Sequence, residues 1–105
     1  MPAPTNKALA RILVVDDEQL IRWSLSERLT DEGYKVFEAG TAAEALAKSD
    51  EGVDLVFLDY HLPDADGLSV LKRIKELHPD TLVILLTADT NLRTAVEAMK
   101  QGAYH

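Results

Sequence analysis

Acidic side chains follow two apolar segments of this chain. If the two segments lie side by side, these side chains could bind one ligand together. Asp16 and Asp17 come directly after the apolar run 12–15, and Asp59 ends the largely apolar segment 53–59. Three carboxylates brought together repel one another unless a proton or a cation neutralises them. Hard oxygen ligands without His or Cys suit Mg²⁺, and a carboxylate is also a nucleophile toward phosphorus. The pattern therefore favours a metal-assisted reaction of Asp59 with a phosphoryl group.

A third apolar run, 82–86, is followed by Thr87 and Ala88. The hydroxyl of Thr87 is able to donate a hydrogen bond to a phosphoryl oxygen. Ala88 is small and leaves its backbone N–H accessible to the same group. These two residues add a hydrogen-bonding member to the predicted acidic site.

Each of these residues also has an ordinary structural interpretation. Asp59 alone is typical of a turn, the acids 16–18 are typical of a helix N-terminus, and Thr87 alone is typical of a helix cap. Their joint position after three strands of one sheet favours the chemical interpretation. The loop after Asp59 contains three residues that we interpret as turn formers, namely Pro63, Asp64 and Gly67.

Alternating strands and helices are predicted to position these side chains. Apolar runs rich in β-branched residues predict strands over 11–16, 34–39, 53–59 and 81–86. Apolar residues at helical spacing predict helices over 19–31, 42–49, 68–77 and 91–101. Thr41 and Glu44 have the spacing of a capping box. Such an order predicts an α/β fold, a doubly wound parallel sheet whose ligand lies at the carboxyl ends of the strands.

The first predicted helix has an inner stripe at i, i+4 and i+8, formed by Ile21, Leu25 and Leu29. Trp23 lies off that stripe, so we expect it to be partly exposed. Gly33 is expected to end the helix in a left-handed conformation.

Length and composition narrow the class of protein. A chain of 105 residues with 47% hydrophobic residues predicts one domain, which we place at 10–105 after a disordered lead-in at 1–9. The absence of cysteine excludes disulfide frameworks and thiol catalysis. A net charge of -7 disfavours direct contact with nucleic acid. No apolar stretch is long enough to span a membrane, and we expect a cytoplasmic protein.

Four segments of the chain resemble the receiver domain of two-component response regulators. They are ILVVDDE at 12–18, LDYHLPDADG at 58–67, LTA at 86–88 and AVEAMKQGAY at 95–104. The last segment is especially similar to receivers of the NtrC type, which precede an ATPase module and a DNA-binding module. The resemblance implies a flavodoxin-like (CheY-like) fold and a phosphoacceptor that is regulatory rather than an enzyme.

The resemblance also implies a role for each residue of the site. Asp59 accepts a phosphoryl group from a sensor histidine kinase and thereby controls an output domain. Thr87 is the switch hydroxyl, and the backbone N–H of Ala88 binds the phosphoryl group. His61 modulates the lifetime of the phosphate. The implied ligands of Mg²⁺, or of Mn²⁺ in its place, are Asp16, Asp17, Asp59 and the main-chain carbonyl of His61.

The chain departs from the receiver pattern at its end. Receivers continue into a fifth strand, a Lys-Pro pair and a fifth helix, so we expect an incomplete domain with strand order 2-1-3-4. The strand at 34–39 carries Lys35 and Glu38, which suit a sheet edge. The run 82–86 carries no charge. We therefore expect self-association through this fourth strand and the helix at 91–101, or else marginal stability of the monomer.

Two other interpretations stay open. One is a Mg²⁺-dependent phosphohydrolase with an aspartate nucleophile. That class normally has a second Asp two residues after the nucleophile, and here His61 occupies this position. The other is a receiver-like binding module that is never phosphorylated.

Overall fold

The computed structural model describes residues 10–86, which form a four-stranded parallel sheet and three helices. The elements are β1 (Arg11–Val15), α2 (Gln19–Asp31), β2 (Lys35–Ala39), α3 (Ala42–Ser49), β3 (Leu55–Asp59), α4 (Gly67–Leu77) and β4 (Leu82–Leu86). The strand order β2-β1-β3-β4 and the parallel pairing confirm the predicted doubly wound sheet. The predicted lead-in at 1–9 and the predicted helix at 91–101 lie outside the described residues.

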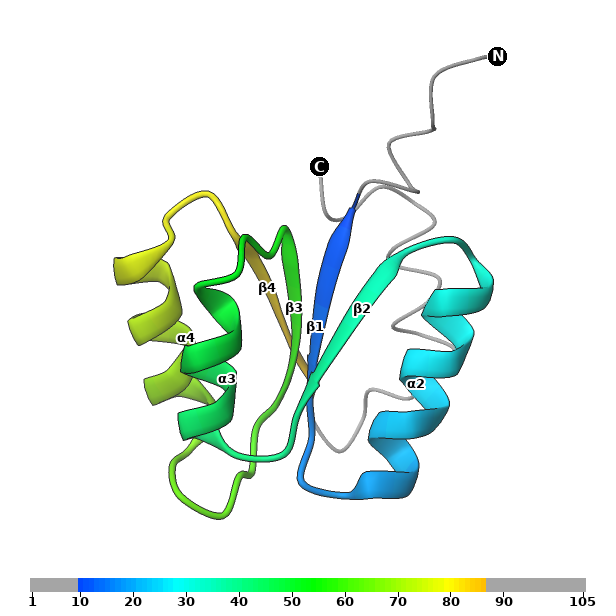
Figure 1. Ribbon diagram of the computed structural model, residues 1–105. Coiled ribbons are helices and arrows are strands. Elements are labelled where there is room, and N and C mark those ends of the chain that lie inside the picture. Colours follow the sequence, from blue (N-terminus) through cyan, green and yellow to red (C-terminus); the bar gives the residue numbers. More distant parts are fainter. Residues whose placement is uncertain (1–9, 87–105) are drawn as a thin grey trace.

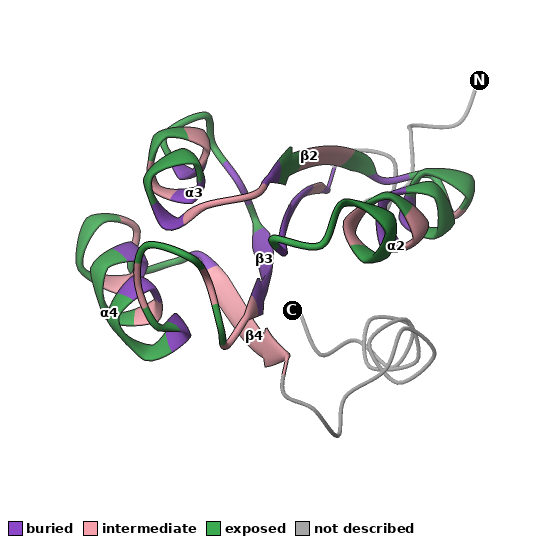
Figure 2. Cartoon of the chain, turned by 90° about the horizontal axis from the view of Figure 1, so that it is seen from below, coloured by how far each residue is buried: buried purple, intermediate pink, exposed green. Residues whose placement is uncertain are grey.

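The helices cover the two faces of the sheet, with α2 on one face and α3 and α4 on the other (Figure 1). Side chains of a strand alternate between the faces. Ile12 and Val14 pack with the α2 side of the core, whereas Leu13 and Val15 pack with the α3 and α4 side. Because β1 and β3 are central, they are the most deeply buried strands (Figure 2). Their carboxyl ends therefore lie between two packed cores.

Helix α2 has the predicted bounds, but its inner face differs from the predicted stripe. Leu25 and Leu29 are buried as expected, and Gly33 after the helix has the expected positive φ of 100°. The prediction for Ile21 is wrong, because this side chain is 48% exposed. Ile21 belongs to the first turn of α2, which lies beyond the carboxyl end of β1 (Figure 1). Trp23 is 54% exposed, as expected.

The capping box predicted for α3 is present with one change. The Thr41 side chain accepts a hydrogen bond from the backbone N–H of Glu44 at 3.1 Å. The Glu44 carboxylate reaches back to the backbone N–H of Gly40 at 2.7 Å, one residue before the expected partner. Both interactions stabilise the start of α3 close to the end of β2.

The two outer strands of the described sheet differ in character. β2 is an edge strand, as predicted, and its charged residues Lys35 and Glu38 are exposed. β4 is wholly apolar, and all five of its residues are only half-buried. Self-association through β4 stays a prediction. Within residues 10–86, no helix has the length and apolar character needed to cross a membrane.

Candidate functional site

Three carboxylates lie together at the carboxyl edge of the sheet. Asp16 and Asp17 follow β1, and Asp59 is the last residue of β3. These two strands are neighbours, and their register pairs Val15 with Leu58. The next residue on each strand is therefore an aspartate, and ligand oxygens of all three aspartates lie within 4.8 Å of one another. The fold thus brings together the acidic residues that the sequence placed at this edge.

The cluster is electrostatically unfavourable in the absence of a neutralising group. Asp16 is 7% exposed, and burial raises its pKa, with further increases from the charges of Asp59 and Asp17. Burial also raises the pKa of Asp59, and the nearby carboxylate of Asp17 raises it further. Hydrogen bonds from backbone N–H groups oppose both shifts. A bound cation would relieve the repulsion, since it favours the charged carboxylates.

The main chain and side chain of Asp16 are held by three hydrogen bonds. Its carboxylate accepts from the backbone N–H of Glu18 at 2.8 Å. Its backbone N–H donates to the carbonyl oxygen of Ala39 at 3.1 Å, across the β1–β2 pair. Its own carbonyl oxygen accepts from the Arg22 guanidinium at 2.7 Å. Asp16 is therefore fixed from β2, from α2 and from the loop between β1 and α2.

The loop after Asp59 folds back toward the end of β3. The backbone N–H of His61 donates to Asp59 Oδ1 at 3.3 Å, which orients the carboxylate. The backbone N–H of Gly67 donates to the carbonyl oxygen of Tyr60 at 2.6 Å. The main chains of His61 and Asp66 pair in an isolated antiparallel β-bridge. The exposed His61 ring stands edge-on to the Tyr60 ring, with 4.8 Å between the ring centroids. These contacts place His61 beside the acidic cluster.

Two residues of this loop have roles that the turn-former interpretation missed. The Asp64 carboxylate accepts from the backbone N–H groups of Ala42 at 2.8 Å and Ala43 at 3.1 Å, so it caps α3. These bonds lower the pKa of Asp64. Gly67 is the first residue of α4, and its φ is not positive, unlike that of Gly33 and Gly52. Close packing, rather than a left-handed turn, requires glycine there.

A single sequence carries no signal for the contact made by Asp64, because its partners lie 21 and 22 residues away along the chain. Thr87 and Ala88, the predicted hydroxyl and backbone donors, lie outside the described residues. The last described residue of β4, Leu86, pairs with Asp59 across the β3–β4 ladder.

Comparison with known proteins places the chain in a family. Residues 12–105 match the response regulator receiver domain. A DNA-binding transcriptional regulator NtrC from Proteus hauseri is 44% identical over 96 residues, which are 89% of this chain and 20% of the relative. Sporulation initiation phosphotransferase F from Bacillus subtilis is 39% identical over 94 residues, which are 89% of this chain and 76% of that protein.

A solved structure has the same fold and a related sequence. The response regulator protein TrrA from Thermotoga maritima, determined in complex with Mg²⁺-BeF, is 43% identical with a TM-score of 0.72. The match covers 86% of this chain and 79% of that one. This chain spans about a fifth of the length of the NtrC relatives that it matches. On the family match, the sequence relatives and the shared fold, the chain belongs to the response regulator receiver domain family.

Proposed function

We propose that Asp59 is the phosphoacceptor of this receiver domain and that it takes a phosphoryl group from the phosphohistidine of a sensor histidine kinase. The observation that carries the proposal is the convergence of Asp16, Asp17 and Asp59 at the end of two buried central strands. Of the three, Asp16 is buried and has its carboxylate hydrogen-bonded to the loop. Asp59 is half-buried and oriented by His61, which suits a nucleophile that a phosphodonor must reach.

In this reaction a phosphoryl group moves from a histidine of the kinase, to which it is covalently bound, to Asp59. A carboxylate oxygen of Asp59 forms a bond to phosphorus, while the bond between phosphorus and the imidazole nitrogen of the kinase breaks. The electron pair of that bond stays on the imidazole, and an acylphosphate is left on Asp59. The hydrogen bond from the His61 N–H keeps the carboxylate in a fixed orientation during attack.

The acidic cluster fits Mg²⁺, or Mn²⁺ in its place. The donor set consists of carboxylate oxygens within 4.8 Å of one another, and a cation would offset the burial and mutual repulsion that raise the pKa values of Asp16 and Asp59. We assign Asp16, Asp17, Asp59 and the main-chain carbonyl of His61 as ligands. When bound, the metal would offset the negative charge of the incoming phosphoryl group.

The remaining roles follow the family resemblance. We propose that Thr87 and the backbone N–H of Ala88 bind the phosphoryl group, and that the domain signals to an output domain. Similarity to the NtrC relatives supports an ATPase module and a DNA-binding module as that output. The net charge of -7 leaves contact with nucleic acid to such a module and not to this segment.

Incubation with acetyl phosphate and Mg²⁺, followed by intact-mass measurement, tests the proposal. We expect a gain of one phosphoryl group in the wild-type chain and none in Asp59→Asn. Asp50→Asn is the control, because Asp50 is an exposed aspartate bonded to His78, outside the acidic cluster. Labelling of Asp59→Asn at the wild-type level would refute the assignment.

The same experiment separates the alternative functions. A phosphohydrolase would turn over many equivalents of a phosphate ester without retaining a stable modification. A binding module that is never phosphorylated would show no mass gain at any concentration of phosphodonor.

A further inference from the structure

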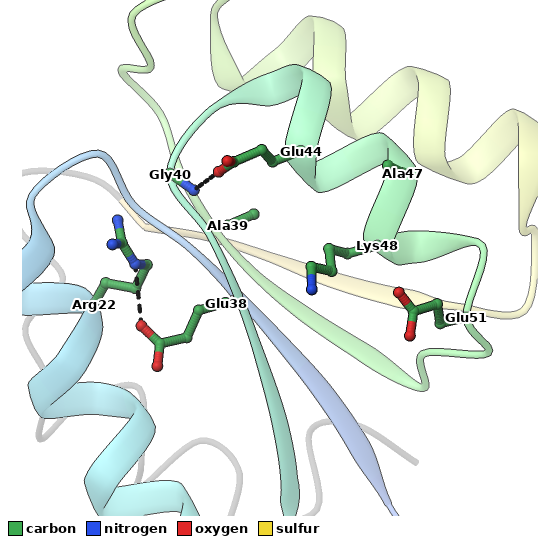
Figure 3. Close-up of a pocket in the computed structure, with 8 residues that line it drawn as sticks. All are labelled: Arg22, Glu38, Ala39, Gly40, Glu44, Ala47, Lys48 and Glu51. Carbon is green, nitrogen blue, oxygen red and sulfur yellow. Dashed lines mark hydrogen bonds and ion pairs between the residues drawn. The ribbon is translucent and has the colours of Figure 1, made fainter.

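Arg22 connects the outer edge of the sheet to the acidic cluster. Its guanidinium makes two hydrogen bonds in different directions, from Nη1 to the carbonyl oxygen of Asp16 at 2.7 Å and from Nε to Glu38 Oε1 at 3.1 Å. The side chain is only 18% exposed. Figure 3 shows Arg22 projecting from α2 toward Glu38 on β2. Both residues line a groove of about 420 Å³. One side chain of α2 therefore contacts both β2 and the residue that follows β1.

The carbonyl that Arg22 holds belongs to the peptide group between Asp16 and Asp17. Rotation of that peptide would change the direction in which the Asp17 side chain leaves the main chain. The backbone N–H of Asp16 is already bonded to Ala39, so Arg22 fixes the other side of the residue. Asp17 itself is exposed, and its direction depends on the main chain that carries it.

On one side, the guanidinium packs closely against Gly40. A Cβ on Gly40 would lie 3.0 Å from Arg22 Nη1, which is closer than side chains normally approach. Gly40 lies directly after β2, and its backbone N–H is bonded to Glu44. Glycine at position 40 therefore leaves free the space that the guanidinium occupies beside Glu38 and Asp16.

We propose that Arg22 is a positioning residue for the metal site: it orients the peptide between Asp16 and Asp17 and so preorganises both carboxylates for Mg²⁺. This inference rests on the metal site proposed above. A residue that holds a metal ligand in place typically contributes about 10-fold or more to metal affinity. The planar guanidinium suits this task, since it donates in two fixed directions at once, which a Lys ammonium on a flexible stem does not reproduce.

The charge of Arg22 and its geometry are expected to have opposite effects on the affinity for Mg²⁺. A positive charge near the cluster repels a cation, so its removal alone would strengthen Mg²⁺ binding. If Arg22 preorganises the site, its removal should instead weaken Mg²⁺ binding. Arg22→Lys keeps the charge and loses the paired geometry, whereas Arg22→Met loses both.

The test is a Mg²⁺ titration of the 105-residue chain, followed by the backbone amide NMR signals of Asp17 and Tyr60. We expect the dissociation constant of Arg22→Lys to rise about 10-fold over wild type, and that of Arg22→Met to rise as well. Gly40→Ala, which leaves Arg22 in place but crowds its guanidinium, should raise the constant by a smaller factor. Arg28→Met is the control, because it removes the same charge from an exposed position on α2.

The outcomes separate this inference from the proposed function. Tighter binding in Arg22→Met with unchanged binding in Arg22→Lys would show that only charge matters and would overturn the inference. A lower melting temperature in Arg22→Lys with an unchanged dissociation constant would show a merely structural role and would also overturn it. Absence of Mg²⁺ binding in the wild-type chain would instead refute the metal site itself, and this inference with it.

Discussion

The main chain of Asp59 and that of Gly67 are packed so closely that a Cβ on Gly67 would lie 2.9 Å from the Asp59 carbonyl oxygen. The same Cβ would lie 2.8 Å from the Cα of Tyr60. Both contacts are with backbone, which has little freedom to move. The first residue of α4 therefore sits against the end of β3, at the residue that we assign as the phosphoacceptor.

We predict that Gly67→Ala both destabilises the domain and impairs phosphorylation. The added methyl group must push α4 away from β3 or displace Asp59, and overpacking of this kind costs about 1–3 kcal/mol. Urea denaturation measures the loss in the free energy of unfolding, and mass spectrometry with acetyl phosphate measures the rate of labelling.

Gly52→Ala serves as the matched control. Gly52 has a positive φ of 83° and no atom within 4 Å of its Cβ position, so alanine there strains the backbone without a clash. It lies before β3, at the opposite end from Asp59. This variant should lose stability and keep the wild-type labelling rate. Equal labelling rates in the two variants would contradict our account of Gly67.

Ser26→Ala is predicted to stabilise the domain. The Ser26 side chain is buried in α2, and among residues 10–86 its Oγ has no hydrogen-bond partner. A buried hydroxyl without a partner is unfavourable, and alanine also has the higher helix propensity, so we expect a gain of about 1 kcal/mol. The comparison is Ser49→Ala, because the Ser49 Oγ donates to the Leu46 carbonyl at 2.7 Å. The prediction fails if Ser26→Ala is the less stable of the two in thermal unfolding.

Asp17→Ala is predicted to abolish the stabilisation of the domain by Mg²⁺. A metal that binds only the folded chain raises its melting temperature, and this variant removes an exposed ligand of the proposed site. Without metal, the variant should melt above wild type, because it removes repulsion on Asp16 and Asp59. Glu27→Ala makes the same change of charge at an exposed position of α2 and should keep the full Mg²⁺ effect. A full Mg²⁺ shift in Asp17→Ala would exclude it as a ligand.

The acidic cluster should make the metal-free domain less stable as pH rises. The pKa values of Asp16 and Asp59 are raised above 3.8, so the folded state binds more protons than the unfolded state in that window. The favourable contribution of these groups is complete below pH 3.8 and is lost as pH rises through their raised pKa values.

Comparison with Asp59→Asn isolates this effect from other carboxylates such as Asp64, whose pKa is lowered. The variant lacks one titrating group and much of the repulsion. Its free energy of unfolding in EDTA, minus that of wild type, should therefore increase from acidic to neutral pH. A difference that does not vary with pH would show that the cluster is not electrostatically strained.

Self-association through β4 is the last prediction. β4 is the outer strand of the described sheet opposite β2, and it is wholly apolar and half-buried. An apolar edge without charges is prone to pair with another chain. Sedimentation velocity over a range of concentrations should show dimers or larger species of the 105-residue chain. A single monomeric species at high concentration would contradict the prediction.

Local patterns in the sequence were sufficient to predict the sheet and the place of the acidic cluster. Apolar runs and helical spacing predicted every described element, and the resemblance to receivers implied the order β2-β1-β3-β4. Once the strands are parallel neighbours, Asp16 and Asp59 must lie at the same edge, because each comes directly after the buried part of its strand. The resemblance to receivers rests on these residues and on the segments 86–88 and 95–104, and the family match covers residues 12–105.

Only the tertiary structure decided how the cluster is supported. Arg22 reaches Glu38 and Asp16, and Asp64 reaches the start of α3, through contacts between elements that no local periodicity encodes. The sequence predicts Gly67 only as a turn residue, whereas its close packing against Asp59 explains why glycine stands there. These contacts depend on how helices and strands are placed relative to one another. For that reason the sequence alone determined which acidic residues meet at the site, and the packing of the fold decided what holds them there.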